Sequence, residues 1–422
     1  MLATETMNPV IIIGAGLAGY TVAREFRKLD KLTPLVIVTK DSGGFYSKPM
    51  LSNAFAQRKT PQQLVTQTAE QMSGQIAGAV LSGTTVLRID PENRRVHTDK
   101  GVLAYRDLII AAGAEPVRLP IPGNAAAAVL SVNHVDDYAI FHARVGLPEH
   151  APATRVAILG AGLIGCEFAD DISSAGHAVT LIDPNSMPLA SIAPPVLSRG
   201  LQQALIDKGV AMRLGTTAAS IDHGNNATHI TLSDGSVVEA DLVLSAVGLR
   251  PNCTLASTAG LTIDRGIVVN ALGLSSDAHI YALGDCAQYT VGEAGATHTM
   301  PYIAPLMSAA RAIARTLAGT PTPVDLKPTP VLVKTPSFPI ALVPPPPDAL
   351  AGGAWVDAVV DQRMISRFYD ATGVMVGFGV APQDAAIRNT LMTSLGRRWF
   401  HVNRTCSVGA EPLVQAQAAE VL

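Results

Sequence analysis

A chain of 422 residues has room for two or three domains. Apolar residues make up 48% and charged residues 15%, which excludes a disordered chain, and a net charge of −3 without runs of like charge gives no sign of nucleic-acid binding. No apolar segment reaches the roughly 18 residues that span a bilayer, and the four cysteines show no zinc or redox spacing. The start of the chain lacks the pattern of a signal peptide, so we expect a cytoplasmic protein without a membrane segment or a bound metal.

The first predicted unit covers residues 10–39 and consists of a strand, a glycine-rich turn, a helix and a second strand. The turn reads GAGLAG, a GxGxxG pattern in which Gly14 makes the tight turn, Gly16 admits a pyrophosphate and Gly19 lets the helix approach the strand. The phosphates of a dinucleotide then bind free N–H groups at the helix start. Asp41, just after the second strand, is the candidate to bind the ribose, with a surface turn residue as the alternative.

The same unit recurs over residues 155–183, where the turn reads GAGLIG and Gly160, Gly162 and Gly165 take the three glycine positions. A single GxGxxG is weak support for a dinucleotide site, but two copies, each between a strand and a helix, indicate two sites. Asp183 ends the second strand of this copy, and no arginine follows it directly. This favours NAD over NADP, because a carboxylate binds the ribose hydroxyls whereas an arginine would accommodate the 2′-phosphate.

Three further strand-like segments end in glycine, in the sequences AAG, AVG and LGD. Glycine at a strand end permits a chain crossing or a close approach to a cofactor. The candidate cofactor-binding residues at these ends are Ala112, Gly113, Gly248, Gly284 and Asp285. The carboxylate of Asp285 would bind a hydroxyl of a ribityl chain, and an ordinary turn aspartate is the alternative.

Lys48 lies in FYSKPMLSN, a segment that follows the first unit and can reach a bound cofactor. It is a candidate to stabilise a reduced, anionic flavin, although most lysines simply lie in solvent. Glu167 is expected in the first turn of the second helix, where an acid also complements the helix dipole; a contact between Lys48 and Glu167 across the domain boundary is the sharper hypothesis. A helix over 300–318 would direct its N-terminus at the pyrimidine end of a flavin, or serve as an ordinary core helix.

The C-terminal part begins with a proline-dense stretch over 321–350. Strand-like segments follow at 355–360, 364–369 and 374–380. Residues 391–422 show no clear periodicity, and we assign them no role.

These motifs, in this order, resemble the flavoprotein reductases with two dinucleotide-binding domains, the glutathione-reductase-like superfamily. Within it, FYSKPMLSNAF and MPYIAPLM most resemble the rubredoxin reductases. The resemblance implies an α/β fold with two Rossmann-like dinucleotide-binding domains and a smaller C-terminal α+β domain. The implied division is an FAD-binding domain at 8–117 and 246–325, an NAD-binding domain at 118–245 and an interface domain at 326–390.

The resemblance also implies roles for the candidate residues. Lys48 and Glu167 would form a catalytic pair near the reactive ring of FAD, and Lys334 would approach that ring from the third domain. The other residues implied to contact FAD are Gly14, Gly16, Gly19, Asp41, Pro49, Ala112, Gly113, Gly248, Gly284, Asp285, Pro301 and Tyr302. The residues implied to bind NADH are Gly160, Gly162, Gly165 and Asp183.

Disulfide reductases of this superfamily carry a CxxxxC motif after the first unit, where this chain has FYSKPMLSN without cysteine. Electrons would therefore pass as a hydride from NADH to FAD and leave singly to rubredoxin, for example to supply an alkane hydroxylase. A ferredoxin reductase of an oxygenase system is the alternative in the same class. A flavin- and NAD-binding sensor without turnover is the alternative in another class.

Overall fold

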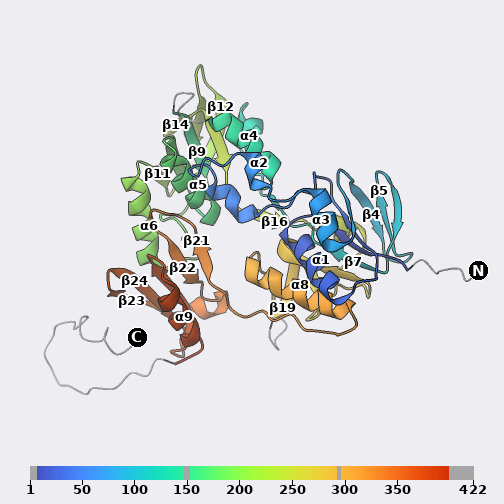
Figure 1. The fold of residues 1–422 in the computed structure, drawn as a ribbon. Coiled ribbons are helices and arrows are strands. Elements are labelled where there is room, and N and C mark those ends of the chain that lie inside the picture. Colours follow the sequence, from blue (N-terminus) through green and yellow to red (C-terminus); the bar gives the residue numbers. More distant parts are fainter. Residues whose placement is uncertain (1–6, 147–152, 292–295, 399–422) are drawn as a thin grey trace, which may run out of the picture.

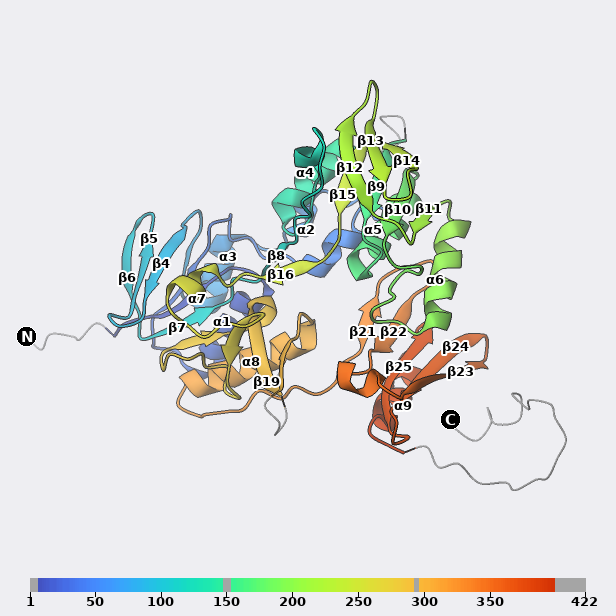
Figure 2. The ribbon, with the colours of Figure 1, turned by 180° about the vertical axis from the view of Figure 1, so that it is seen from behind.

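The computed structural model describes residues 7–146, 153–291 and 296–398 of the chain. They form three bodies, which Figures 1 and 2 show from opposite sides. The first body contains the beginning of the chain and a later return of it, the second lies between these two parts in sequence, and the third is C-terminal. Over the described ranges, no helix is both long enough and apolar enough to cross a membrane.

The first body is built on a five-stranded parallel sheet of order β18-β7-β1-β2-β3. Its strands are β1 (Val10–Ile13), β2 (Leu35–Val38), β3 (Ala79–Leu81), β7 (Asp107–Ile110) and β18 (Ile280–Ala282). All four residues of β1 are buried, because a parallel strand between helices is covered on both faces, and this explains its unbroken apolar sequence. The helices α1 (Leu17–Leu29) and α8 (Ile303–Leu317) pack against each other in this body (Figure 1).

Smaller elements complete the first body. They are α3 (Ala69–Ile76), α7 (Thr254–Thr258), η3 (Gly284–Cys286), an antiparallel sheet of β4 (Val86–Asp90), β5 (Arg95–Thr98) and β6 (Gly101–Ala104), and a second small sheet of β17 (Ile267–Val269), β19 (Ala287–Val291) and β20 (Ala296–Thr299).

The second body repeats the arrangement with a four-stranded parallel sheet of order β11-β10-β9-β15. Its strands are β9 (Arg155–Leu159), β10 (Ala178–Asp183), β11 (Ala211–Leu214) and β15 (Leu242–Ser245); its helices are α4 (Val135–Val145), α5 (Leu163–Ser174) and α6 (Pro195–Asp207). An antiparallel sheet of β12 (Ala218–His223), β13 (Thr228–Leu232) and β14 (Val237–Ala240) and the short η2 (Ala126–Ala128) complete it. Leu159 pairs with Ile182, so the strand before the GAGLIG turn and the strand that carries Asp183 end together.

Two short antiparallel strands connect these bodies, β8 (Ala114–Pro116) and β16 (Leu249–Pro251). Each strand follows a glycine with positive φ, +68° at Gly113 and +114° at Gly248. Such backbone favours glycine, so the strand-end glycines permit the crossings.

One segment near the N-terminus leaves the first body and packs into the core of the second. It contains η1 (Lys48–Asn53) and α2 (Pro61–Leu64). Leu51 and Phe55 are buried in the same apolar cluster as side chains of α4, α5 and the third body. The segment therefore joins parts of the chain that lie far apart in sequence.

The third body is an antiparallel sheet of order β21-β22-β25-β24-β23. Its strands are β21 (Val331–Val333), β22 (Ile340–Val343), β23 (Ala354–Val360), β24 (Arg363–Tyr369) and β25 (Met375–Ala381), with η4 (Pro347–Leu350) and α9 (Ala385–Ser394) beside them. A Cβ on Gly379 of β25 would stand 2.7 Å from the Leu197 side chain of α6, so this sheet packs closely on the second body. Helix α9 continues past residue 390, and the rest of the predicted tail, from residue 399, lies outside the described residues.

Candidate active site

In the first glycine turn, close packing requires glycine at two of the three positions, and the third glycine borders open space. A Cβ on Gly14 would stand 2.3 Å from the carbonyl oxygen of Ala111, and a Cβ on Gly19 would stand 1.9 Å from that of Gly14. A Cβ on Gly16 would meet no protein atom within 4 Å. The protein leaves space at the position where such turns accept a pyrophosphate, so this turn fits a dinucleotide.

The second glycine turn has the same geometry. A Cβ would stand 2.7 Å from the Ala246 carbonyl oxygen at Gly160 and 1.9 Å from the Gly160 carbonyl oxygen at Gly165. At Gly162 it would meet nothing within 4 Å. Both turns therefore fit a dinucleotide for the same physical reason.

The helices after the two turns begin without a side-chain cap. Gly16 and Gly162 are the N-cap residues of α1 and α5, and neither helix has an acidic residue in its first turn. Their first N–H groups are thus free of side-chain acceptors and suited to phosphate. The expectation that Glu167 lies in the first turn is wrong, because α5 begins at Leu163 and Glu167 falls in its second turn, so stabilisation of the helix dipole does not explain this acid.

The acid that ends β10 is already engaged with the second turn. One oxygen of Asp183 accepts the Ala161 N–H at 2.6 Å, and the other accepts the backbone and side-chain N–H groups of Asn185 at 2.7 and 2.8 Å. Asp183 thus orders the GAGLIG turn itself. In the first body, Asp41 accepts the hydroxyl of Thr39, the residue that directly follows β2.

The structure brings Lys48 and Asp285 together, although they are far apart in sequence. The Nζ of Lys48 lies 3.8 Å from a carboxylate oxygen of Asp285. Gly284 has φ +77°, and a Cβ there would stand 3.1 Å from the Cβ of Ala18, which places the Asp285 turn directly on α1. Burial lowers the pKa of Lys48, and the nearby Asp285 carboxylate opposes this effect.

The predicted contact between Lys48 and Glu167 is wrong. Glu167 is fully buried, and its counterion is Lys334, whose Nζ lies 2.9 Å from one oxygen and whose backbone N–H donates to the other at 3.0 Å. The hydroxyl of Ser52 donates to Glu167 as well. Lys334 follows β21 directly and reaches Glu167 from the third body, which supplies the charge that a buried carboxylate requires.

Lys334 joins three parts of the chain. Besides Glu167, its ammonium donates to the Asn53 side chain at 3.1 Å and to the Pro49 carbonyl oxygen. The backbone oxygen of Lys334 accepts the Asn53 side-chain N–H in return, at 2.7 Å. The structure therefore places Lys334 against the segment of Lys48 and Pro49, the segment that the resemblance assigns to the flavin.

Two of the other candidates are glycines that border open space. Gly113 and Gly248 flank the crossings, and a Cβ on either would meet nothing within 4 Å. Ala112 directly precedes Gly113. Tyr302 is the N-cap of α8, one helical turn before the buried part of that helix, and it remains partly exposed together with Pro301.

Sequence reasoning missed several polar contacts of this region. Asp170 and Asp171 on α5 bind segments of other bodies, although their spacing from Glu167 already indicated a shared helix face. The hydroxyl of Tyr46 accepts the Val135 N–H at the start of α4, and no sequence signal indicated it. Among the described residues no cluster of three metal-ligating side chains occurs.

Comparison with known proteins identifies the family. The family model for pyridine nucleotide-disulphide oxidoreductases matches residues 8–312, and a model for the rubredoxin binding C-terminal domain matches residues 323–395. A rubredoxin-NAD(+) reductase of Alcanivorax borkumensis is 41% identical over 377 residues, covering 89% of this chain and 95% of that protein. The chain belongs to the rubredoxin-NAD(+) reductase family. Membership of this family of pyridine nucleotide-disulphide oxidoreductases implies binding of FAD and NAD.

Other relatives agree with this family and its fold. A nitric oxide reductase FlRd-NAD(+) reductase of Aeromonas hydrophila subsp. hydrophila is 37% identical, covering 92% of this chain and 96% of that protein. The solved ferredoxin reductase of the CYP199A2 system from Rhodopseudomonas palustris has a TM-score of 0.82 at 26% identity and covers 93% of this chain and 96% of its own. Putidaredoxin reductase in its covalent complex with putidaredoxin gives the same TM-score at 24% identity, with 93% and 94% covered, which speaks for the fold alone. The predicted glutathione-reductase-like fold is confirmed.

Proposed function

We propose that this chain is an NADH:rubredoxin reductase, which takes a hydride from NADH and passes the electrons one at a time to rubredoxin. The observation that carries the proposal is the rubredoxin-binding domain at 323–395, whose Lys334 contacts the segment of Lys48 and Pro49. A carrier bound to that domain would lie next to the part of the chain that we assign to the flavin.

Each of the three bodies is assigned one ligand or partner. We assign FAD to residues 8–117 and 246–325, NADH to residues 118–245 and the carrier to residues 326–390. FAD, when bound, accepts a hydride and releases electrons singly. NADH rather than NADPH is assigned because Asp183 places a carboxylate at the end of β10 and Pro184 follows it.

The residues near the assigned flavin position offset negative charge. Lys48 would place a cation beside the ring, where charge develops on reduction, and Asp285 would orient that cation or bind the ribityl chain. The N-terminus of α8, at Tyr302, would add the positive end of a helix dipole. Lys334 forms an ion pair with Glu167 and would position the segment of Lys48 and Pro49 rather than bind the flavin ring.

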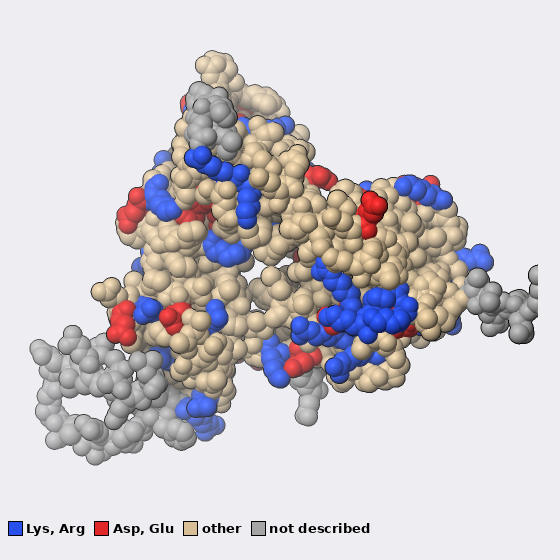
Figure 3. All heavy atoms as spheres, in the orientation of Figure 1, with Lys and Arg blue, Asp and Glu red and all other residues tan. Residues whose placement is uncertain are grey.

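A basic face on the first body fits an acidic partner. Figure 3 shows Lys and Arg side chains gathered over α1 and α8. Exposed or half-exposed residues there are Arg24, Lys28, Lys31, Arg311 and Arg315, which we call the basic face. Rubredoxins are generally acidic, so this surface would attract the carrier toward the molecule and raise the rate of encounter, whereas docking is assigned to residues 326–390.

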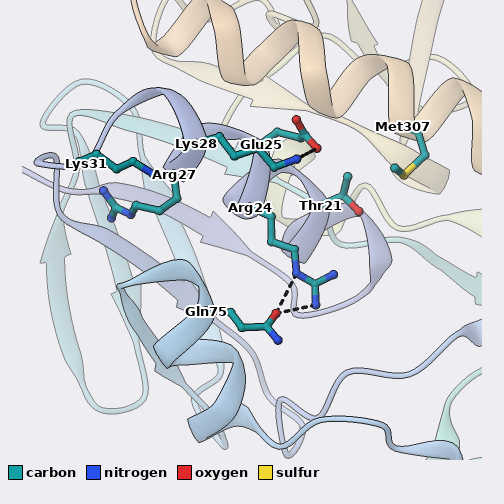
Figure 4. A pocket seen from close by; sticks show the side chains of 8 residues that line it. All are labelled: Thr21, Arg24, Glu25, Arg27, Lys28, Lys31, Gln75 and Met307. Atoms are coloured by element: carbon teal, nitrogen blue, oxygen red, sulfur yellow. Dashed lines mark hydrogen bonds and ion pairs between the residues drawn. The ribbon is translucent and has the colours of Figure 1, made fainter.

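Three residues of the basic face, Arg24, Lys28 and Lys31, line a pocket beside α1. It measures about 410 Å³, and Figure 4 shows Arg24 directed at Gln75 and Lys28 at Glu25, the one acid in its lining. Arg24 donates to the uncharged side chain of Gln75 at 3.0 Å, and Arg27 donates to backbone carbonyl oxygens. Two guanidinium groups thus face the pocket with uncharged acceptors.

A cytoplasmic location belongs to the same proposal, because the reaction consumes NADH. Among the described residues, Cys166, Cys253 and Cys286 are free thiols. Free thiols are usual in a reducing compartment. Burial raises the pKa of Cys286 to about 12, so its thiol stays protonated and takes no part in the proposed reaction.

Steady-state oxidation of NADH with purified rubredoxin and with a [2Fe–2S] ferredoxin tests the proposal. We expect the higher kcat/KM with rubredoxin. A higher value with ferredoxin would replace rubredoxin by the alternative carrier. Failure to oxidise NADH with either carrier, or with ferricyanide, would leave the chain as a sensor without turnover.

A further inference from the structure

Helix α5 buries three carboxylates on one side. Glu167, Asp170 and Asp171 stand at spacings of three and four residues, so their side chains share one face of the helix. Their exposed fractions are 0%, 0% and 4%. Burying so many acids is unfavourable unless each has partners, and the partners identify what each acid holds in place.

The three acids hold different parts of the chain. Glu167 and Asp170 each have a lysine, Lys334 at 2.9 Å and Lys208 at 3.1 Å. Asp171 instead accepts two successive backbone N–H groups, that of Phe55 at 2.8 Å and that of Ala56 at 3.0 Å. These residues come directly after Ala54, the C-cap of η1, and η1 begins with Lys48 and Pro49.

A carboxylate is the group that this position requires. Each oxygen of Asp171 accepts one of the two N–H groups. An asparagine would offer one oxygen and turn its own NH₂ toward the second N–H. Burial nevertheless raises the pKa of Asp171 to about 6. The N–H groups of Ala56 and Phe55 oppose this effect, and the charges of Asp170 and Glu167 add smaller contributions to it.

The surroundings of the anchor carry few other charges. The Phe55 ring lies between the rings of His142, with centroids 5.0 Å apart, and His177, with centroids 5.6 Å apart. Burial lowers the pKa of both histidines, so they are neutral near pH 7. Tyr138 of α4 also faces the acid, and its pKa is raised by burial and by Asp171.

We propose that Asp171 is a positioning residue: its ionised carboxylate anchors Phe55 and Ala56, and thereby holds Lys48 and Pro49 in place beside the assigned FAD position. Protonation of Asp171 replaces a charge-assisted acceptor by a weaker one and loosens residues 48–56. The reductase then gains a pH dependence from a residue that touches neither FAD nor NADH. The anchor itself rests on the geometry, and its effect on FAD rests on the proposed function.

Hydrogen exchange of the FAD-loaded protein tests the anchor. In the wild type, the amides of Phe55 and Ala56 should lose protection as the pH falls through about 6, after correction for intrinsic exchange. In Asp171→Asn they should exchange about tenfold faster at pH 7.5 and show no such step. Asp207→Asn, which neutralises an exposed acid at the end of α6 in the same body, is the matched control and should behave as the wild type.

A second readout concerns the cofactor. The rate at which NADH bleaches the bound FAD should show a step near pH 6 in the wild type and in the control, and none in Asp171→Asn. If Asp171→Asn does not fold, the wild-type step in Phe55 and Ala56 exchange still decides the question. Protection that is independent of pH in the wild type, or unchanged by Asp171→Asn, would overturn the proposal. Rubredoxin turnover is measured separately, so its absence would contradict the proposed function and leave the anchor standing.

Discussion

Packing within the protein does not explain why residues 16 and 162 are glycines. A Cβ at either position would meet no protein atom within 4 Å, whereas Gly19 and Gly165 each face a backbone oxygen at 1.9 Å. The sequence pattern predicted that all these glycines belong to dinucleotide-binding turns. The structure separates those that packing requires from those that leave room for a ligand.

Gly16→Val should therefore remove FAD from the purified protein and leave the fold intact, because the added side chain would fill ligand space without meeting protein atoms. Gly162→Val should keep full FAD content and raise the KM for NADH by about tenfold or more. FAD content is read from visible absorbance, and circular dichroism checks the fold. A fully loaded Gly16→Val protein would contradict the assignment of the first turn.

Lys48→Ala should make the midpoint potential of bound FAD more negative, because a cation that stabilises the reduced form is lost. The shift is about 30 mV for each 1.4 kcal/mol of lost stabilisation in a two-electron couple. Equilibrium titration against a redox dye measures it. Lys40→Ala, which removes an exposed lysine after β2, is the control and should leave the midpoint potential unchanged. If Lys48→Ala has the same midpoint potential as the wild type, Lys48 is an ordinary surface lysine.

At the scale of elements, local patterns predicted the strands and the turns between them. β23, β24 and β25 begin and end within one residue of the strands predicted at 355–360, 364–369 and 374–380, because the apolar pattern of a strand is local to its own sequence. The lysine that pairs with Glu167 was not predictable in this way. Lys48 was the predicted partner, and Lys334 was expected only near the flavin. The actual pairing depends on where the third body docks, which no local pattern encodes.

Asp171 of α5 makes the stability of the protein depend on pH. The folded-state pKa of Asp171, about 6, lies above its ordinary value of 3.8, so folding takes up a proton between these values. The associated stability is fully present below about pH 4 and is lost as the pH rises through 6, because global unfolding exposes Asp171 to water. Local loosening of residues 48–56 has the opposite sign, because it breaks the hydrogen bonds that lower the pKa of Asp171 and leaves the acid buried. The free energy of unfolding of the wild type, relative to Asp171→Asn, should fall by up to about 3 kcal/mol between pH 4 and 7. Urea titrations of both proteins measure it, and a difference that does not vary with pH would contradict the assignment.

At the scale of the whole molecule, a net charge of −3 conceals the basic face on α1 and α8. Composition gave no indication of it, because its residues come from segments about 290 positions apart in the chain and are brought together by helix packing. Long-range attraction of this kind acts on the rate of encounter and is screened by salt. The kcat/KM for an acidic carrier should therefore depend on ionic strength.

Raising the salt concentration should lower kcat/KM for rubredoxin. The rate of ferricyanide reduction should depend less steeply on salt. The double variant Lys28→Gln/Lys31→Gln should lower kcat/KM for rubredoxin several-fold at low salt. Lys100→Gln, an exposed lysine between β5 and β6, is the matched control. Equal kinetics in the double variant and the control would exclude the basic face from carrier association.

Anaerobic titration of the FAD-loaded protein with NADH in the presence of excess oxidised rubredoxin tests the central claim most directly. NADH delivers two electrons and rubredoxin takes one, so we predict two reduced rubredoxins for each NADH consumed, and none with Gly16→Val. Oxidation of NADH without reduction of rubredoxin would contradict the account.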